Sequence, residues 1–445
     1  MTTKATLAPQ QASWPAPQFH VGVDTHADTH TIAILDAAGR VAETSTHPAT
    51  PEGYREVIGT LRGLGDPSVV QVGVEGTNSY GAGLTRALAD DTFEVFEVLR
   101  PTRQVRRMDG KSDPIDAVEA ARTLMSGRGI SVPKSGIGTA ESLRYLTVAR
   151  NKYVSTMIAL SNAILALLVT APAQIRTKYG AKGTKQTLRN LQHCRPGHLD
   201  TTSVDFYVLT TLKTMAKTHQ TLQEAADQLE KRMGHLVEAH YPALLNLHGV
   251  GVITAATLAV TAGDNPQRIH SEAAFAKMCG ACPIPASSGR TNRHRLNRGG
   301  DRQANMALHR IALVRMRHHE PTRKYVARQV TRGKTKREAI RQVKRALCRT
   351  VYRALTQPQP APQPDQNPEL PDGPHLRRIR IQKDLTQAQV ATALGTNPTQ
   401  ISNIETDRWP HTTLRARYHQ WLKTPTKTQP PQTRPPSHQK PETNI

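Results

Sequence analysis

The chain has 445 residues, which is too many for one ordinary hydrophobic core, so two or three folded units are expected. Its formal net charge is +24, and residues 290–349 alone contain 19 lysines or arginines against three acidic residues. A solubilising surface usually mixes both signs of charge. The excess therefore predicts a protein that binds a polyanion, and we favour nucleic acid.

The cysteines and the apolar stretches exclude several other classes. Four cysteines are too few for a disulfide framework in a chain of this length, and Cys279 and Cys282 lack the second ligand pair of a zinc site. The first residues contain no apolar signal segment, and the apolar run at 157–173 is interrupted by Ser161 and Asn162. We interpret that run as a buried helix face, not a membrane span, and expect a cytoplasmic, nucleoid-associated protein.

The first folded unit is expected at residues 18–135, after a disordered segment at 1–17. Apolar runs with turns at 27–28 and at Gly39 predict three strands joined by hairpins. The same patterns predict further strands at 68–77 and 93–99, and helices at 55–63, 81–90 and 113–126. Strands in hairpins, followed by strands that alternate with helices, indicate a mixed α/β sheet.

The rest of the chain is predicted to be helical. Residues 136–243 keep apolar positions at steps of three and four, which indicates a long antiparallel helical arm or coiled coil. Such an arm is a natural surface for self-association, and we expect a homo-oligomer, either a dimer or a tetramer. A small helical domain follows at 244–356, then a proline-rich linker at 357–374 and a helical module at 375–422. Residues 423–445 are expected to be a disordered tail.

Four acidic residues of the first unit are candidates for a metal site. Asp24 ends the strand in "VGVDT" and Glu75 ends the strand in "VGVEG", so both are expected at the ends of paired buried strands. Asp113 and Asp116 lie three residues apart on one predicted helix and therefore share a face. A structural alternative makes Asp113 the helix N-cap and Pro114 the first helical residue. Four converging carboxylates would repel one another without cations, and such hard oxygen ligands suit Mg²⁺ or Mn²⁺.

These stretches resemble a known family. The segments "VGVDTHADTHTIAILD", "GVEGTNSYGAGLTRAL" and "GKSDPIDAVEAART" are similar to the RuvC-like (ribonuclease-H-like) domain of DEDD-type insertion-sequence transposases. The resemblance implies that Asp24, Glu75, Asp113 and Asp116 bind the divalent metal and act in catalysis. It also implies that the chain combines two fold classes, with an α/β nuclease domain followed by all-α domains.

A glycine-containing turn lies in "LLNLHGVGVITAATLAVTAGD", residues 244–264, and is typical of a helix–hairpin–helix. Backbone N–H groups around Gly249 and Gly251 would then hold a DNA phosphate without reading bases. The alternative is a glycine turn between two packed helices. This segment by itself leaves both interpretations open.

Two serines precede a run of arginines in "PASSGRTNRHRLNRGGDR", residues 285–302. The residues alone leave open whether Ser287 or Ser288 attacks a phosphate or only lines a phosphate-binding loop. The stretch is similar to the C-terminal domain of the same transposases, in which a serine directly before a glycine is catalytic. The resemblance implies that Ser288 is the nucleophile, with Ser287 as the second candidate. The nucleic-acid-binding candidates beside it are Arg290, Arg293, Arg295, Arg298 and Arg302.

The module beyond the linker, "LRRIRIQKDLTQAQVATALGTNPTQISNIETDRWP", resembles the Cro/repressor-type helix-turn-helix. Gly395 is the expected turn, and "NPTQISNIE" is the expected recognition helix. Its candidates for contacts with bases or phosphates are Thr399, Gln400, Ser402 and Asn403. The module is an addition to the transposase pattern, and the sequence does not decide between a role at the element's own DNA and a role in regulation.

The function that the resemblance implies is a transposase, a DNA recombinase that cuts and rejoins strands of an insertion sequence through a covalent serine–DNA intermediate. Its partners would be donor and target DNA and a structured guide ("bridge") RNA, with no membrane. One alternative keeps only the metal site, as a junction-resolving nuclease with Ser288 in an ordinary loop. Another is a helix-turn-helix regulator whose nuclease fold is a relic.

Overall fold

The structure is a computed structural model that describes residues 17–98, 112–180, 183–265, 268–289, 294–356, 370–407 and 412–423. It divides into two compact units, Met1–Pro362 and Gln363–Ile445, and each is described by itself. The segments predicted to be disordered or linking fall largely outside the described residues, so those predictions are not tested.

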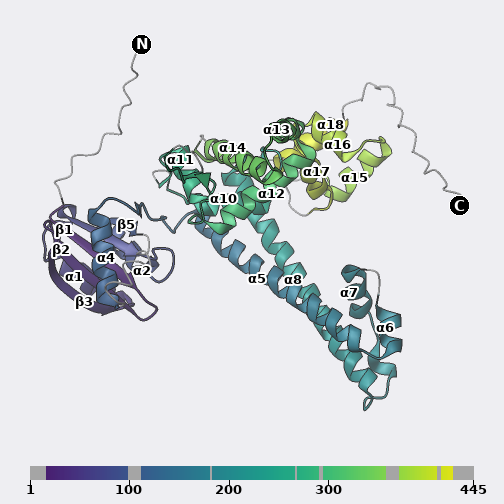
Figure 1. The fold of residues 1–445 in the computed structure, drawn as a ribbon. Helices are drawn as coiled ribbons and strands as arrows, with labels where there is room; N and C mark the ends of the chain where they lie inside the picture. The colour runs from purple at the N-terminus through teal and green to yellow at the C-terminus, as the bar shows by residue number, and fades with distance from the viewer. Residues whose placement is uncertain are drawn as a thin grey trace, which may run out of the picture. The chain divides into compact units, whose positions relative to one another are not determined.

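The N-terminal domain is built on a six-stranded mixed sheet in the order β3-β2-β1-β4-β5-β6 (Figure 1). Strands β1, β2 and β3 pair antiparallel, β4 and β5 continue from β1 in parallel, and β6 pairs antiparallel with β5. Their bounds are β1 (Phe19–Thr25), β2 (Thr29–Asp36), β3 (Val41–Pro48), β4 (Val70–Glu75), β5 (Glu94–Val98) and β6 (Ile130–Ser131). The mixed sheet confirms the predicted fold class of this domain.

Helices cover both faces of the sheet. Ile32 and Ile34 of β2 pack with residues of α1 (Pro51–Arg62) and α2 (Ala82–Asp90) in one core. The alternating Ala33 and Leu35 pack with α4 (Asp113–Met125) on the other face. A single turn of 3₁₀ helix, η1 (Pro67–Val69), leads into β4. The unbroken apolar run from Ile32 to Leu35 thus matches a strand that is buried on both faces.

A long helical arm follows, formed by α5 (Thr139–Thr170) and α8 (Val204–His240) (Figure 1). The two helices are antiparallel, because Arg150 pairs with Glu230 near one end and Ile164 shares a core with Leu209 near the other. The sequence patterns did not predict the elements between them: α6 (Ala173–Tyr179), α7 (Thr184–Gln192) and η2 (Pro196–His198).

Helix α5 has the length and composition of a membrane-crossing helix, and it is the only such helix in the described part of the chain. Only 17% of its most apolar window is buried. The run does have a buried face, with Ile164 and Leu168 in a core shared with α8. Its other side is not covered, and Ile158, Leu167 and Val169 are exposed there.

A small helical domain completes the first unit, with its elements at α9 (Pro242–Leu245), α10 (Val252–Ala262), α11 (Glu272–Met278), β7 (Ile284–Pro285), β8 (His294–Arg295), α12 (Arg302–His318), α13 (Glu320–Thr331) and α14 (Lys336–Thr356). The Asp264 carboxylate joins this domain to the arm. It accepts hydrogen bonds of 2.8 and 3.0 Å from the Ala140 amide at the start of α5 and one of 3.2 Å from the Tyr241 hydroxyl.

The second unit is a bundle of four short helices, α15 (Gly373–Gln382), α16 (Gln387–Ala393), α17 (Pro398–Glu405) and α18 (Thr412–Lys423). Its helix starts are capped as the sequence suggests. Thr386 and Gln389 form a capping box at α16, and the Asn397 side chain accepts a hydrogen bond from the Gln400 amide at α17. The predicted helix-turn-helix is confirmed.

Candidate functional site

Two of the predicted acids lie at the carboxyl ends of neighbouring strands. Val23 of β1 pairs in parallel with Val74 of β4, so the next residues, Asp24 and Glu75, follow side by side at one edge of the sheet. Both acids are 6% exposed. The Thr25 hydroxyl donates a hydrogen bond of 2.8 Å to the backbone carbonyl of Glu75 and holds the two strand ends together.

The other two acids come from α4, which packs closely on β1. A methyl group added at Gly22 would lie 2.0 Å from the carbonyl oxygen of Ala117, so glycine at this position lets the helix approach the strand. Asp116, the residue before Ala117, is 4% exposed, whereas Asp113 is partly exposed at the helix start. The predicted N-cap role of Asp113 is wrong, because Ser112 is the N-cap and Asp113 is already helical.

A histidine joins this edge of the sheet. The Nε2 atom of His26 lies 3.1 Å from Oδ2 of Asp24 and 3.3 Å from Oδ1 of Asp113. Ligand atoms of these three residues all lie within 4.8 Å of one another, and the described residues contain no other group of this kind. Two carboxylates and an imidazole are donors that fit a divalent metal ion. We call Asp24, His26, Glu75, Asp113 and Asp116 the acidic centre.

The structure thus brings Asp24 and Asp113 together, and it buries Glu75 and Asp116 on the neighbouring strand and on the same helix. Sequence reasoning missed His26. A signal was present, because His26 follows Asp24 by only two residues, directly after the end of β1.

The serine stretch lies in a second domain, on a short β-hairpin. Ile284 of β7 pairs with Arg295 of β8, and Ser287 and Ser288 are both exposed in the loop between these strands. Gly289 has a φ of +52°, in the left-handed region that favours glycine, so the chain turns directly after Ser288. Arg290 and Arg293 lie outside the described residues.

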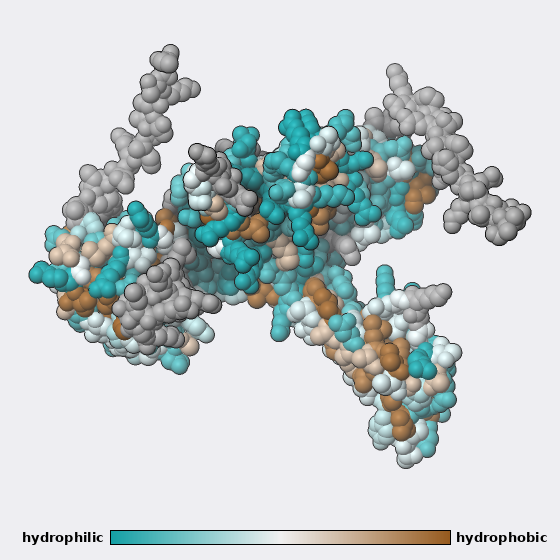
Figure 2. All heavy atoms as spheres, viewed as in Figure 1, coloured by the Kyte–Doolittle hydropathy of each residue, from teal (hydrophilic) through white to brown (hydrophobic). Residues whose placement is uncertain are grey.

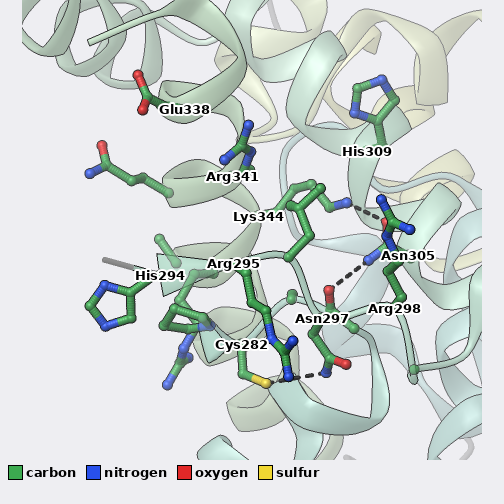
Figure 3. Close-up of a pocket in the computed structure, with 18 of the residues that line it drawn as sticks. Cys282, His294, Arg295, Asn297, Arg298, Asn305, His309, Glu338, Arg341 and Lys344 are labelled. Carbon is green, nitrogen blue, oxygen red and sulfur yellow. Dashed lines mark hydrogen bonds between the residues drawn. The ribbon is translucent and has the colours of Figure 1, made fainter. Parts of the chain in front are cut away.

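A cavity of about 1350 Å³ opens beside this hairpin, and residues of β8, α12, α13 and α14 line it (Figure 3). Its walls hold eight lysines or arginines and one acid, Glu338. Three of the cations, Arg295, Arg298 and Arg302, were predicted as nucleic-acid contacts. Four of the others project from one side of α14: Arg341, Lys344, Arg345 and Arg349. We call this space the cationic cavity.

Carboxylates balance only part of this positive charge. Arg345 and Arg349 share Glu272, at 2.5 and 2.9 Å, whereas Arg298 and Arg341 make no ion pair with any described residue. Burial lowers the pKa of Lys344, and in Figure 3 its ammonium group points to Asn305. Unpaired cations that surround one hollow favour a ligand with several negative charges, as in a nucleic-acid backbone.

The glycine turn before α10 has contacts that explain it without a ligand. Gly249, with a φ of +81°, packs against Ile311 and Arg315 of α12. The Gly251 amide donates a hydrogen bond of 3.0 Å to the Thr254 hydroxyl and caps α10. The preceding α9 is only four residues long. Phosphate binding at Gly249 and Gly251 stays a prediction.

The recognition helix α17 presents three of its four predicted contact residues. Thr399 is exposed, and Ser402 and Asn403 are partly exposed. Gln400 is the exception, with 3% exposure, because the Thr396 hydroxyl donates a hydrogen bond to its side chain in the interior of the turn. The prediction that Gln400 faces DNA is therefore wrong.

Comparison with known proteins agrees with this architecture. Residues 21–171 match a transposase domain of the IS110 DEDD type, residues 241–327 match the family described as transposase IS116/IS110/IS902, and residues 376–413 match a helix-turn-helix family. The insertion element IS110 uncharacterized 43.6 kDa protein of Streptomyces coelicolor is 38% identical over 125 residues. That stretch covers 27% of this chain and 30% of the relative.

The two transposase matches contain the acidic centre and the serine hairpin, respectively, and follow one another in the expected order. The chain belongs to the IS116/IS110/IS902 family of transposases, of the DEDD type, with an appended helix-turn-helix.

Proposed function

We propose that this protein is a transposase that cuts and rejoins the DNA strands of an insertion sequence, with Ser288 as its nucleophile. The observation that supports this most is that Ser288 lies on the exposed loop of a hairpin whose strand β8 lines the cationic cavity through His294 and Arg295. A DNA phosphate bound by the cavity would lie at the same hairpin as the hydroxyl. The matching of this segment to the transposase family supports the same role.

The proposed step forms a bond from Ser288 Oγ to phosphorus and breaks the bond from phosphorus to a sugar oxygen. The serine proton leaves to water, and the departing sugar oxygen takes up a proton. The product is a phosphodiester between Ser288 and the cut strand, and its new serine–phosphate ester bond is the one that breaks in the later rejoining. Reversal with a different sugar hydroxyl joins the new strand and releases the serine.

Asp24, Glu75, Asp113 and Asp116 would hold one or two divalent ions, Mg²⁺ or Mn²⁺. When bound, these ions neutralise negative charge that develops on the phosphate oxygens. The protein's own part is to keep the carboxylates at one edge of the sheet, through the β1–β4 pairing and the close packing of α4 on Gly22. A serine hydroxyl is a weak nucleophile at its ordinary pKa, so it needs such stabilisation of charge nearby.

The nucleic-acid partners would be donor DNA, target DNA and a guide RNA. Arg295, Arg298 and Arg302 line one side of the cationic cavity and the basic face of α14 the other, so the cavity can follow a phosphate backbone from two sides. Thr399, Ser402 and Asn403 would contact a duplex site through the second unit. The support for RNA is limited to the family resemblance and the surplus of positive charge.

Two DNA molecules must be cut and exchanged, so we also propose that the active form is a dimer or tetramer. Apolar side chains gather on the helical arm, where Figure 2 shows brown residues on the surface. Ile158, Leu167, Val169 and Tyr207 are each more than 40% exposed there. A second copy of the arm would cover this surface, and we place the assembly in the cytoplasm on the nucleoid.

The test is a denaturing gel of labelled DNA after reaction with the protein, divalent metal and the element's guide RNA. A slowly migrating protein–DNA adduct is expected with the parent protein and with Ser287→Ala, and none with Ser288→Ala. Cleavage and rejoining by Ser288→Ala would instead support a metal-dependent junction-resolving nuclease that uses water.

A further inference from the structure

We propose that His26 is a metal ligand of the acidic centre, and that its nitrogen biases the site toward Mn²⁺ and later first-row ions over Mg²⁺. The proposal rests on the metal-dependent function proposed above and adds to it a residue outside the predicted four acids. It concerns the identity of the metal that this chain selects.

The spacing of the three donor atoms fits adjacent positions on one ion. Ligands about 2.1 Å from an octahedral ion lie about 3.0 Å apart when they occupy neighbouring positions. The distances from Nε2 of His26 to the carboxylate oxygens of Asp24 and Asp113 are 3.1 and 3.3 Å. The imidazole would need only a small movement to share an ion with both acids.

The backbone fixes His26 at this place. It lies at the end of the β1–β2 hairpin, where its amide donates a hydrogen bond of 2.9 Å to the carbonyl of Thr29. Thr25, directly before it, is tied through its hydroxyl to Glu75 of β4. The end of β1 is thus braced where His26 contacts Asp24, and the His26 side chain is 46% exposed, so the site stays open to substrate and water.

The chemistry of the donors predicts the preference. Mg²⁺ binds mainly oxygen, whereas imidazole nitrogen suits transition metals, and the affinity of a mixed site rises from Mn²⁺ to Co²⁺ and Ni²⁺. A site made only of the four carboxylates would suit Mg²⁺ as well as it suits Mn²⁺. Replacing the nitrogen with oxygen at position 26 is therefore expected to move the preference toward Mg²⁺.

A different role for the same geometry is a hydrogen-bond clamp, in which an Nε2–H group bridges the two carboxylates and competes with a metal. The two roles predict opposite effects of removing the ring. Loss of a ligand weakens metal binding, whereas loss of a clamp strengthens it.

The experiment is Mn²⁺ binding to the full chain without DNA, followed by electron paramagnetic resonance, with detection of ¹⁴N coupling to the bound ion. The parent protein is compared with His26→Ala, with His26→Asp and with His47→Gln. His47, which pairs with Glu56 at the β3 side of the sheet, is a control for histidines in general. Circular dichroism establishes that each variant is folded, and His26→Asp keeps a polar ligand if His26→Ala is unstable.

We expect ¹⁴N coupling in the parent and in His47→Gln but in neither His26 variant. The affinity for Mn²⁺ should fall at least about tenfold in His26→Ala, and competition should show His26→Asp shifted toward Mg²⁺. Persistence of the ¹⁴N coupling in His26→Ala, or a rise in its Mn²⁺ affinity, would overturn the proposal. The outcome of this experiment does not depend on the serine chemistry. If ¹⁴N coupling is found but no Ser288–DNA adduct forms, His26 is a metal ligand and Ser288 is not the nucleophile.

Discussion

The ammonium group of Lys344 donates a hydrogen bond of 2.5 Å to Oδ1 of Asn305 on the wall of the cationic cavity. The Asn305 amide is held in turn, because its Nδ2 donates to the carbonyls of Cys279 and Gly280 at 2.8 and 3.0 Å. A cation held in this way loses little side-chain freedom when a phosphate binds, whereas a free surface lysine loses more. Lys344 is therefore expected to contribute more to nucleic-acid binding than an average lysine of this chain.

Lys344→Gln should weaken binding of DNA and lower the slope of log affinity against log salt by about one, because one phosphate contact is lost. The measurement is fluorescence anisotropy of labelled DNA across a salt series. Lys324→Gln, which removes the same charge from an exposed position on α13, is the matched control. Equal slopes for the two variants would show that Lys344 does not contact the backbone.

Loss of the acidic centre should stop the chemistry and leave binding intact. Asp24→Ala, Glu75→Ala and Asp116→Ala are each expected to lower recombination by at least about a hundredfold, because charge on the reacting phosphate is no longer neutralised. Recombination and nucleic-acid affinity are measured in parallel. Glu119→Ala, on the same helix but paired with Arg122, should stay active. Full activity in EDTA would contradict a metal site.

Removal of the second unit should leave the folding and the cleavage activity of the first unit unchanged. The second unit has its own apolar core, which includes Leu376, Ile401 and Tyr418. A chain that ends after residue 356 should fold and cleave a saturating DNA substrate at the parent's rate, but bind particular duplex sites less well. Loss of cleavage at saturation would show that the helix-turn-helix is part of the active assembly.

A buried ion pair makes the second unit sensitive to acid. Burial by itself would raise the pKa of Glu405, but hydrogen bonds from Arg380, Gln387 and Tyr418 outweigh it and lower that pKa below its ordinary value. The carboxylate therefore stabilises the fold above its unfolded pKa, and this stability is lost as the pH falls through the lower pKa of the folded state.

Glu405→Gln leaves the Arg380 guanidinium without its partner and should cost about 3 kcal/mol of unfolding free energy. It should also flatten the loss of stability in acid. Hydrogen exchange of α15 and α17 amides, measured at several pH values, checks both effects. An unchanged acid dependence in Glu405→Gln would assign the sensitivity to another group.

The sheet and its two strand-end acids could be predicted from local patterns, because the apolar runs and the segments "VGVDT" and "VGVEG" involve only residues that are neighbours in the sequence. The helix of α4 begins at Asp113 as predicted, and the structural alternative of Asp113 as its N-cap is wrong, because Ser112 and Asp113 are both residue types that favour this position. Gln400 was misassigned for a similar reason. A polar residue on a short helix can face inward when a neighbour, here Thr396, satisfies its side chain with a hydrogen bond.

The site could be predicted only in part, because its geometry depends on contacts between distant segments. His26 contacts Asp113, which lies 87 positions later in the chain, and no local sequence pattern predicts that contact. The cationic face of α14 did have a local signal in the spacing of Arg341, Lys344, Arg345 and Arg349, but the cavity arises only when this face meets the hairpin. Helices α6 and α7 went unrecognised because short amphipathic segments resemble parts of longer ones.

The role of Ser288 as the nucleophile is tested most directly by locating the attached nucleotide on the protein. The reaction with DNA is stopped by denaturation, the DNA is digested to a short remnant, and tryptic peptides are sequenced by mass spectrometry. The peptide that ends at Arg290 contains both serines, so fragmentation separates them. A nucleotide phosphodiester is expected on Ser288 and none on Ser287. A remnant on Ser287, on another residue or on no residue, with DNA cleaved and rejoined, would contradict it.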